Sequence, residues 1–254
     1  MTNYNILLPP SEGKIEGGKE KYIEAKSRHA FGFLENDRKF LLKNLLDFIS
    51  KASNSDLEKL FSVKSNISNI TSFLENFDQK LTLPTIERYS GVMFSAIDYP
   101  SLGDAHKDRA NNSILFIDAL FGLLRVQDLI PNYKLAISAK FSDFKIDNYW
   151  KRIIKNYLKE ILKDKIILDI LPQAHRKAVD ISSETHYLIN FFEIKNNKAK
   201  NAGHISKKLK GEFVRYILGF DEISLEILYN FSHSEGYIYS EDLSSNSEII
   251  FLKS

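Results

Sequence analysis

The chain has 254 residues and no cysteine, and its 35 Lys and Arg against 33 Asp and Glu give a net charge of +2. The lack of cysteine excludes a disulfide scaffold, a thiolate metal site and a thiol nucleophile. A hydrophobic content of 43% excludes a disordered chain. Because the overall charge is near zero, only local clusters of charge can indicate a charged partner.

The most apolar window, residues 113–130, is interrupted by Asp118, Arg125 and Asp128. It is therefore shorter than the roughly 20 uncharged residues that a membrane span needs. The first residues also lack the basic segment of a signal peptide. We expect a soluble cytoplasmic protein with no membrane partner.

Strands and helices are predicted to alternate without a regular βαβ rhythm, which indicates one α+β domain over residues 1–254 with a mixed sheet and surrounding helices. The predicted strands are residues 4–8, 134–138, 165–170, 187–193 and 249–252, and residues 91–97 are predicted to form a strand or a short turn. The predicted helices are residues 39–51, 56–61, 67–77, 112–124, 149–162 and 206–218. Residues 112–124 are expected to be the central buried helix, and residues 83–87 a linker.

The first candidate site follows the predicted strand at residues 4–8. Pro9 and Pro10 stiffen the exit of the chain from that strand, and Ser11, Gly13 and Lys14 come directly after them. Backbone N–H groups and one ammonium at a strand end are suited to binding an anion. An ordinary polar turn is the alternative, since the spacing is not that of a phosphate-binding P-loop.

The second candidate segment is residues 120–135. Gly122 inside a predicted helix costs about 1 kcal/mol relative to Ala, which close packing would explain. Arg125 and Asp128 form an i,i+3 pair at the predicted helix end, before Pro131. Either the pair only shapes the turn, or Asp128 orients the Arg125 guanidinium toward a phosphate or carboxylate.

The third candidate segment is the predicted helix at residues 206–218 with the residues before it. Ile205, Leu209, Phe213 and Ile217 form its core stripe. Lys208, Gly211 and Arg215 project to one side, where a glycine between two cations would let a phosphate approach the backbone. The cations from here back to residue 195 form the densest basic cluster of the chain: Lys195, Lys198, Lys200, Lys207, Lys208, Lys210 and Arg215. A solvated lysine face is the alternative.

The fourth candidate segment is residues 231–247, in which Glu235 is the best single candidate for a general acid or base. A structural role is the alternative for an isolated carboxylate. The six histidines are spread singly along the chain, so no zinc site is predicted. No cofactor is predicted either.

Together these segments resemble the YaaA family of peroxide stress resistance proteins over nearly the whole chain. The matching stretches are ILLPPSEGK at 6–14, RYSG at 88–91, ALFGLLRVQDLIPNYKL at 119–135, NYW at 148–150, HISKKLKGEFVRYIL at 204–218 and FSHSEGYIYSEDLSSNSEIIF at 231–251. The form PPSEGK is similar to one branch of the family, whereas another branch has a shorter version. The resemblance implies a single-domain α+β fold with a positively charged cleft and a helix-hairpin-helix-like element. It also implies binding of double-stranded DNA and a role in limiting damage from hydrogen peroxide and iron.

These observations lead to the expectation of a DNA-binding stress protein. Lys207, Lys208, Lys210 and Arg215 would contact phosphates, and Ser11, Lys14 and Arg125 would line the cleft. Such binding would be non-specific and sensitive to salt, since it depends on a few phosphate contacts.

The alternative is an enzyme that acts on a nucleotide-like small molecule or a damaged nucleobase in the same pocket. Glu235 or Asp128 would then be the acid or base, and Lys14, Lys208 and Arg215 would hold the phosphate. A third hypothesis, weak iron binding by carboxylates, lacks a predicted set of metal ligands. The first two hypotheses require Lys14, Lys208 and Arg215 to lie in one cationic hollow.

Overall fold

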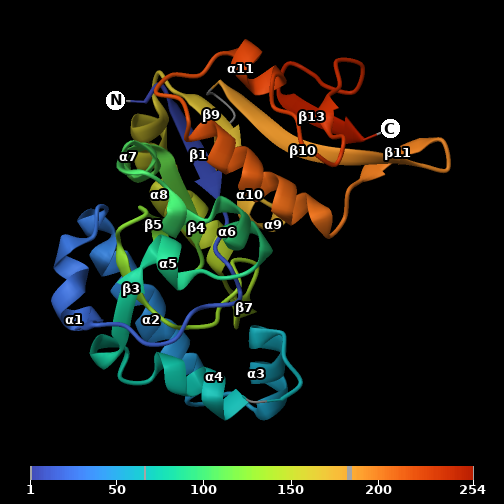
Figure 1. Ribbon diagram of the computed structural model, residues 1–254. Helices are drawn as coiled ribbons and strands as arrows, with labels where there is room; N and C mark the ends of the chain where they lie inside the picture. Colours follow the sequence, from blue (N-terminus) through green and yellow to red (C-terminus); the bar gives the residue numbers. More distant parts are fainter. Residues whose placement is uncertain (1, 66, 182–184, 254) are drawn as a thin grey trace.

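A computed structural model describes residues 2–65, 67–181 and 185–253 of the chain (Figure 1). In the described residues the main sheet has eight strands, in the order β12-β13-β10-β9-β1-β4-β5, with β11 paired to β10. The neighbours β13, β10, β9, β1 and β4 run parallel, whereas β5, β11 and β12 pair antiparallel. The predicted α+β fold with a mixed sheet is therefore confirmed. The helix-hairpin-helix-like element that the resemblance implies stays a prediction.

The strands of the main sheet are β1 Tyr4–Leu8, β4 Ile114–Asp118, β5 Gly122–Leu124, β9 Ile166–Asp169, β10 His186–Lys195, β11 Lys198–Asn201, β12 Ile238–Tyr239 and β13 Glu248–Lys253. Two small sheets accompany it, one from β2 Glu20–Lys21, β3 Leu81–Pro84 and β6 Leu129–Pro131, the other from β7 Lys140–Phe141 and β8 Phe144–Lys145. The α-helices are α1 Tyr22–Ala25, α2 Glu35–Ile49, α3 Asn54–Phe61, α4 Ile67–Leu74, α5 Thr85–Arg88, α6 Val92–Ile97, α7 Asp104–Ser113, α8 Ile146–Leu162, α9 Gln173–Arg176, α10 Ile205–Ile217 and α11 Leu225–Tyr229. In the part of the chain that the structure describes, no helix has the length and apolar character needed to cross a membrane.

Elements with a clear hydrophobic pattern are confirmed. Strand β1 is buried along its whole length, as a strand between two parallel neighbours must be. Helices α8 and α10 each bury one apolar stripe, and α10 lies against both α6 and β10 (Figure 1). The predictions for α2, α3, α4, β9, β10 and β13 are confirmed within a few residues.

The central helix predicted at residues 112–124 is wrong. The chain leaves α7 and forms the antiparallel hairpin of β4 and β5 instead. A short run that is apolar on all sides does not by itself distinguish a buried helix from a buried strand. Close packing at Gly122 is confirmed, because a Cβ there would lie 2.6 Å from the Trp150 ring. Gly122 also has a φ of +71°, which suits the hairpin turn and not a helix.

Three smaller expectations also differ from the structure. Residues 91–97 are mostly the helix α6, which starts after Gly91 and packs on α10. Residues 134–138 form no strand, and residues 83–87 belong to β3 and α5 and not to a linker. In each case the segment is too short for its own periodicity to outweigh the contacts it makes with neighbouring elements.

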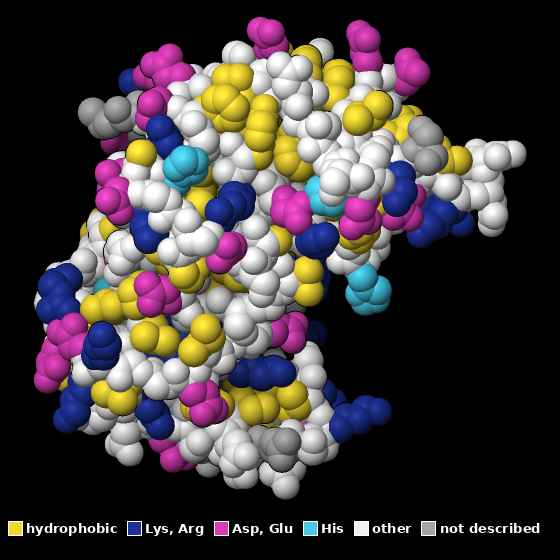
Figure 2. Space-filling model, in the orientation of Figure 1, with side chains coloured by type: hydrophobic (Ala, Val, Ile, Leu, Met, Phe, Trp, Pro, Cys, Tyr) yellow, Lys and Arg dark blue, Asp and Glu magenta, His cyan; other side chains and the backbone are white. Residues whose placement is uncertain are grey.

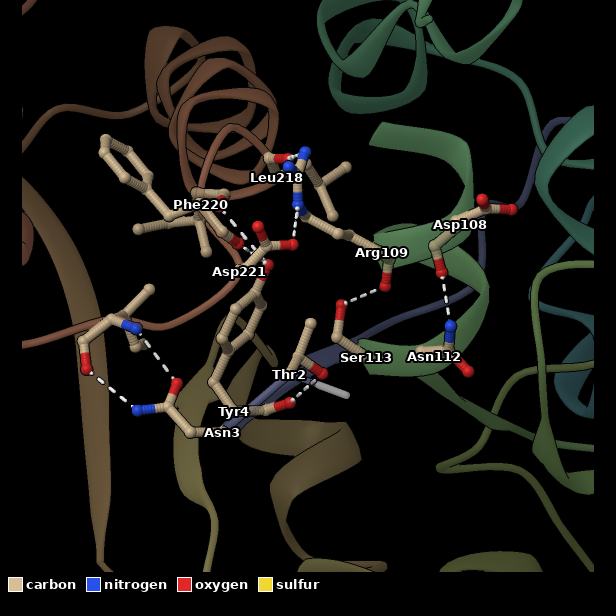
Figure 3. Close-up of polar contacts among 12 residues, drawn as sticks. Thr2, Asn3, Tyr4, Asp108, Arg109, Asn112, Ser113, Leu218, Phe220 and Asp221 are labelled. Carbon is tan, nitrogen blue, oxygen red and sulfur yellow. Dashed lines mark hydrogen bonds and ion pairs between the residues drawn. The ribbon is translucent and has the colours of Figure 1, made fainter. Parts of the chain in front are cut away.

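Polar side chains fasten the amino-terminal end of β1 to α7 and to the end of α10 (Figure 3). The Tyr4 hydroxyl lies 3.0 and 3.3 Å from two backbone carbonyls that follow and end α10. The Asn3 side chain accepts from the Ile223 N–H at 2.9 Å and donates to its carbonyl at 3.1 Å. Arg109 Nε donates to Asp221 at 2.7 Å. Because these groups find partners within the chain, this end of the sheet has a structural role.

Candidate active site at the carboxyl ends of the parallel strands

Three neighbouring parallel strands, β9, β1 and β4, have their carboxyl ends side by side, at the end of the sheet opposite to Asn3 and Tyr4. Strand β1 leads into Pro9 and Pro10, β4 ends at Asp118, and β9 ends at Asp169. Both carboxylates are almost completely buried, with 0% and 1% of their residue surface exposed. Ligands of open α/β sheets bind outside the carboxyl ends of the strands, so a ligand site is expected at this end of the sheet.

The Asp118 carboxylate accepts four hydrogen bonds. Its Oδ1 accepts from the backbone N–H groups of Leu120 at 2.8 Å and Phe121 at 2.9 Å. Its Oδ2 accepts from the hydroxyls of Tyr89, at 2.7 Å, and Tyr133. Burial and the adjacent carboxylate raise the pKa of both tyrosines well above 10, so both phenols stay protonated.

Lys14 extends from the loop after β1 onto the same two tyrosines. Its Nζ lies 4.5 Å from the ring centre of Tyr133 and 5.5 Å from that of Tyr89, and it donates to the Ser11 carbonyl at 3.0 Å. Burial lowers the pKa of Lys14 to about 8, although the nearby Asp118 charge acts in the other direction. A lysine with such a lowered pKa is partly neutral near pH 7.5 and can serve as a base or a nucleophile.

Helix α9 adds a neutral imidazole and a guanidinium to this edge. Burial lowers the pKa of His175 to about 4, against the effect of Asp118. The His175 Nδ1 is buried and has no hydrogen-bond partner among the described residues. Arg176 Nε donates to Asp169 Oδ2 at 2.5 Å, and the Asp169 Oδ1 accepts from the Leu171 N–H.

Lys210 of α10 is the second partly buried lysine of the site. Its Nζ is 3.4 Å from the Ile170 carbonyl, and burial lowers its pKa to about 8, although Asp169 acts to raise it. The carboxyl ends of the parallel strands therefore carry Lys14, Lys210 and Arg176 around the carboxylates of Asp118 and Asp169. These residues, with Tyr89, Tyr133 and His175, are called the strand-end site. Desolvated cations in this arrangement favour an anionic group of a ligand.

Comparison with known proteins places the chain in a family. The model of the family described as peroxide stress protein YaaA matches residues 4–243. The UPF0246 protein FN1762 of Fusobacterium nucleatum is 26% identical over 250 residues, which cover 98% of each chain. UPF0246 proteins of Rickettsia africae and Shewanella piezotolerans are 29% and 27% identical and are matched over 88% and 87% of their lengths.

The chain belongs to the YaaA family of peroxide stress proteins. The family resemblance inferred from the motifs is thereby confirmed, and membership supports a role in the oxidative stress response. The motif ILLPPSEGK corresponds to β1 and the loop that carries Lys14, and the motif around residues 119–135 contains the Asp118-binding turn and Tyr133.

The structure brings only part of the predicted site of this YaaA-family protein together. Ser11, Lys14 and Lys210 lie at the carboxyl ends of the strands, while Lys207 is exposed on α10. Lys208 and Arg215 line an open groove of about 830 Å³ between α6 and α10, and its lining also includes Gly91.

Both cations of that groove already have partners within the chain. Lys208 Nζ lies 3.8 Å from Glu212 and 3.5 Å from Glu235. Arg215 donates to the Ile97 carbonyl at 2.8 Å. The exposed Glu235 thus pairs with Lys208 and not with Lys14.

Arg125 and Asp128 do not belong to the strand-end site. The Arg125 guanidinium donates to the carbonyls of Asn112 and Ile114, at the start of β4 and hence at the opposite end of the sheet from Asp118. Asp128 accepts from the backbone N–H groups of Arg125 and Ala30, each at 2.7 Å. The interpretation that Asp128 orients the guanidinium is wrong, because its carboxylate shapes the turn through the backbone.

The role inferred for Gly211 is also wrong. A Cβ on Gly211 would lie 2.3 Å from the Met93 carbonyl and 2.7 Å from the Ala96 Cβ of α6. The close approach that glycine allows is therefore that of a neighbouring helix, and no phosphate can reach this backbone.

Sequence reasoning missed the side chains at the centre of the site: Tyr89, Asp118, Tyr133, Asp169, His175 and Arg176. A usable signal was present at Asp118 and Asp169, since each is a charged residue directly after a continuous apolar run. The predicted helix over residues 112–124 concealed it for Asp118. The two tyrosines carry no such signal, because their hydroxyl partner lies in a distant segment.

Proposed function

We propose that this YaaA-family protein is an enzyme of the oxidative stress response whose reaction takes place at Lys14 and Asp118. The observation that carries the proposal is a mostly buried lysine with a lowered pKa that lies over the rings of two protonated tyrosines, whose hydroxyls bind a buried carboxylate. Perturbed titratable groups at the carboxyl ends of parallel strands are typical of active sites.

The neutral form of Lys14 would take up a proton from the substrate. The ammonium that results is stabilised by the Asp118 charge and by the faces of Tyr89 and Tyr133. The tyrosine hydroxyls and two backbone N–H groups hold the carboxylate in place, so little reorganisation accompanies the proton transfer.

The substrate class follows from the cations beside this pair. Lys210 and Arg176 lie at the end of β9, and partial burial lowers the pKa of Lys210. Arg176 already pairs with Asp169, whereas Lys210 donates to a backbone carbonyl, so a small phosphate-bearing molecule such as a nucleotide would supply a counter-charge to Lys210. The nucleotide-like substrate suggested by the sequence thus stays the preferred class, with Lys14 in place of Glu235 or Asp128 as the base.

Survival of peroxide-treated bacteria tests the proposal. Cells lacking the gene for this chain would express the wild type, Lys14→Met, Asp118→Asn or the control Lys43→Met, in which an exposed lysine of α2 is changed. We expect the first two variants to lose protection and the control to keep it, with melting temperatures measured on each purified protein. Full protection by a folded Lys14→Met protein would refute the proposal.

A second candidate function, binding of double-stranded DNA, rests on a different surface. The hairpin of β10 and β11 projects from the molecule next to the start of α10 (Figure 1). Lys198, Lys200 and Lys207 are exposed there, and Figure 2 shows Lys and Arg side chains beside acidic ones in this region. Exposed lysines of this kind suit non-specific contact with phosphates.

A salt series on duplex binding tests this candidate. Each lost phosphate contact lowers the slope of log K against log salt by about 0.9, so the triple Ala variant of these lysines should lose roughly 2–3 from the slope. A Lys208→Ala, Arg215→Ala variant should change it less, because both groups pair within the chain. Lys14→Met should leave it unchanged. An unaltered slope in the triple variant would exclude this surface.

A further inference from the structure

A cavity of about 630 Å³ lies between α2, the 3-10 turn Phe77–Gln79 and the turn that joins β4 to β5. Leu120 and Phe121 contribute to its wall, and their backbone N–H groups also bind Asp118; its other lining residues lie outside the strand-end site. Its apolar wall consists of Leu42, Leu46, Leu74, Phe77, Leu120 and Phe121. The volume falls within the roughly 300–1,000 Å³ that is usual for small-molecule sites.

Most of the charged groups around this cavity pair with one another. Lys26 binds Asp78 at 2.9 Å, and Lys43 binds Asp47 at 3.1 Å. The Oε1 of Glu35 lies 3.5 Å from Lys39 and 4.0 Å from Lys26.

Arg38 is likewise satisfied, in the floor of the cavity. Its Nε and one terminal nitrogen donate to the carbonyls of Phe121 and Leu123, at 3.0 and 2.9 Å. The other terminal nitrogen contacts His29 Nδ1 at 3.0 Å. The guanidinium is therefore held by the protein, and an anionic ligand would find its charge already engaged.

Glu35 Oε2 differs from all of these groups. The atom is buried and has no hydrogen-bond partner among the described residues. Buried polar atoms in folded proteins nearly always have a partner, so an exception calls for one. Because a carboxylate oxygen only accepts, the missing partner must be an N–H or O–H donor.

We infer that this cavity binds a small molecule that combines an aromatic or aliphatic body with an amine or amidine nitrogen. The nitrogen would donate to Glu35 Oε2, and the body would lie on Phe77, Phe121 and the leucines of α2. The opposite charge of ligand and carboxylate makes this a charge-assisted hydrogen bond. This inference does not depend on the proposed reaction at Lys14.

Benzamidine is a suitable probe, because it joins an amidinium group to a single ring. We expect saturable binding to the wild type by calorimetry or ligand-observed NMR, and much weaker binding of benzyl alcohol, which has the ring without the cation. Glu35→Gln should weaken benzamidine binding by about tenfold or more, in line with hydrogen bonds to charged groups. The control Asp47→Asn removes a carboxylate that is paired with Lys43 and should leave the affinity unchanged.

A second variant keeps Glu35 and blocks the cavity. Leu46→Phe adds a ring to the apolar wall and should abolish binding. Lys14→Met should bind benzamidine as the wild type does, so the result does not depend on the proposed enzyme function. Equal affinity of the wild type and Glu35→Gln, equal loss in Asp47→Asn, or no saturable binding to the wild type would each overturn the inference.

Discussion

Replacement of Lys14 by Met should increase the stability of the protein at neutral pH. Burial lowers the pKa of Lys14 from 10.5 to about 8, and one pKa unit corresponds to about 1.4 kcal/mol. A charged Lys14 therefore costs the folded state up to about 3 kcal/mol. Part of this gain is offset in the variant, because the Ser11 carbonyl loses its donor and the tyrosine rings lose a cation–π contact. A net gain of about 1–2 kcal/mol is expected.

The pH dependence identifies the cause. Since the folded pKa lies below the unfolded one, the folded wild type binds fewer protons than the unfolded chain between about pH 8 and 10.5. The stability of the wild type relative to the variant should therefore rise across this window, and the cost should be fully present below pH 8. Lys210 titrates in both proteins, so its contribution cancels in the comparison.

Urea unfolding of both proteins at pH 7 and at pH 10 measures the effect. The difference in unfolding free energy should be largest at pH 7 and should shrink as Lys14 loses its proton. Lys43→Met, which changes an exposed lysine, should show no such trend. A difference that is the same at both pH values would refute the reasoning that desolvation governs Lys14.

Three further variants test the packing and the turns by urea unfolding. Gly211→Ala should cost about 2 kcal/mol by forcing α6 away from α10, whereas Gly32→Ala, with no atom close to the new Cβ, should cost little. Tyr4→Phe should cost about 1 kcal/mol because two carbonyls at the end of α10 lose a donor, and Tyr157→Phe, at an exposed ring, should be neutral. Asp128→Asn should cost about 1–3 kcal/mol, because an amide has one acceptor oxygen for two backbone N–H groups. If Gly211→Ala, Tyr4→Phe or Asp128→Asn is as stable as the wild type, the contact assigned to that residue is contradicted.

Local pattern alone was enough for a large part of this fold. Helices α8 and α10 each contain enough residues for the periodicity of their apolar stripe to define the element, and β1 is identified as a short buried run that ends at two prolines. The loop after β1 was also identified correctly as a place where polar groups gather, and Lys14 and Ser11 within it lie at the candidate site. The hairpin of β4 and β5 was not, because a run that is buried on every side has no period to interpret.

The sequence by itself thus determined which segments are buried, where a polar loop leaves the sheet, and to which family the chain is similar. The tertiary structure alone decided which charges act together. On α10, Lys207, Lys208 and Lys210 lie within four positions of one another, but successive helical residues are turned by about 100°, so the first is exposed, the second is paired and the third is partly buried. Asp118 conversely joins Tyr89 and Tyr133, which come from separate segments. A side chain's partners and hydration depend on what the rest of the chain packs around it, and no local pattern contains that information.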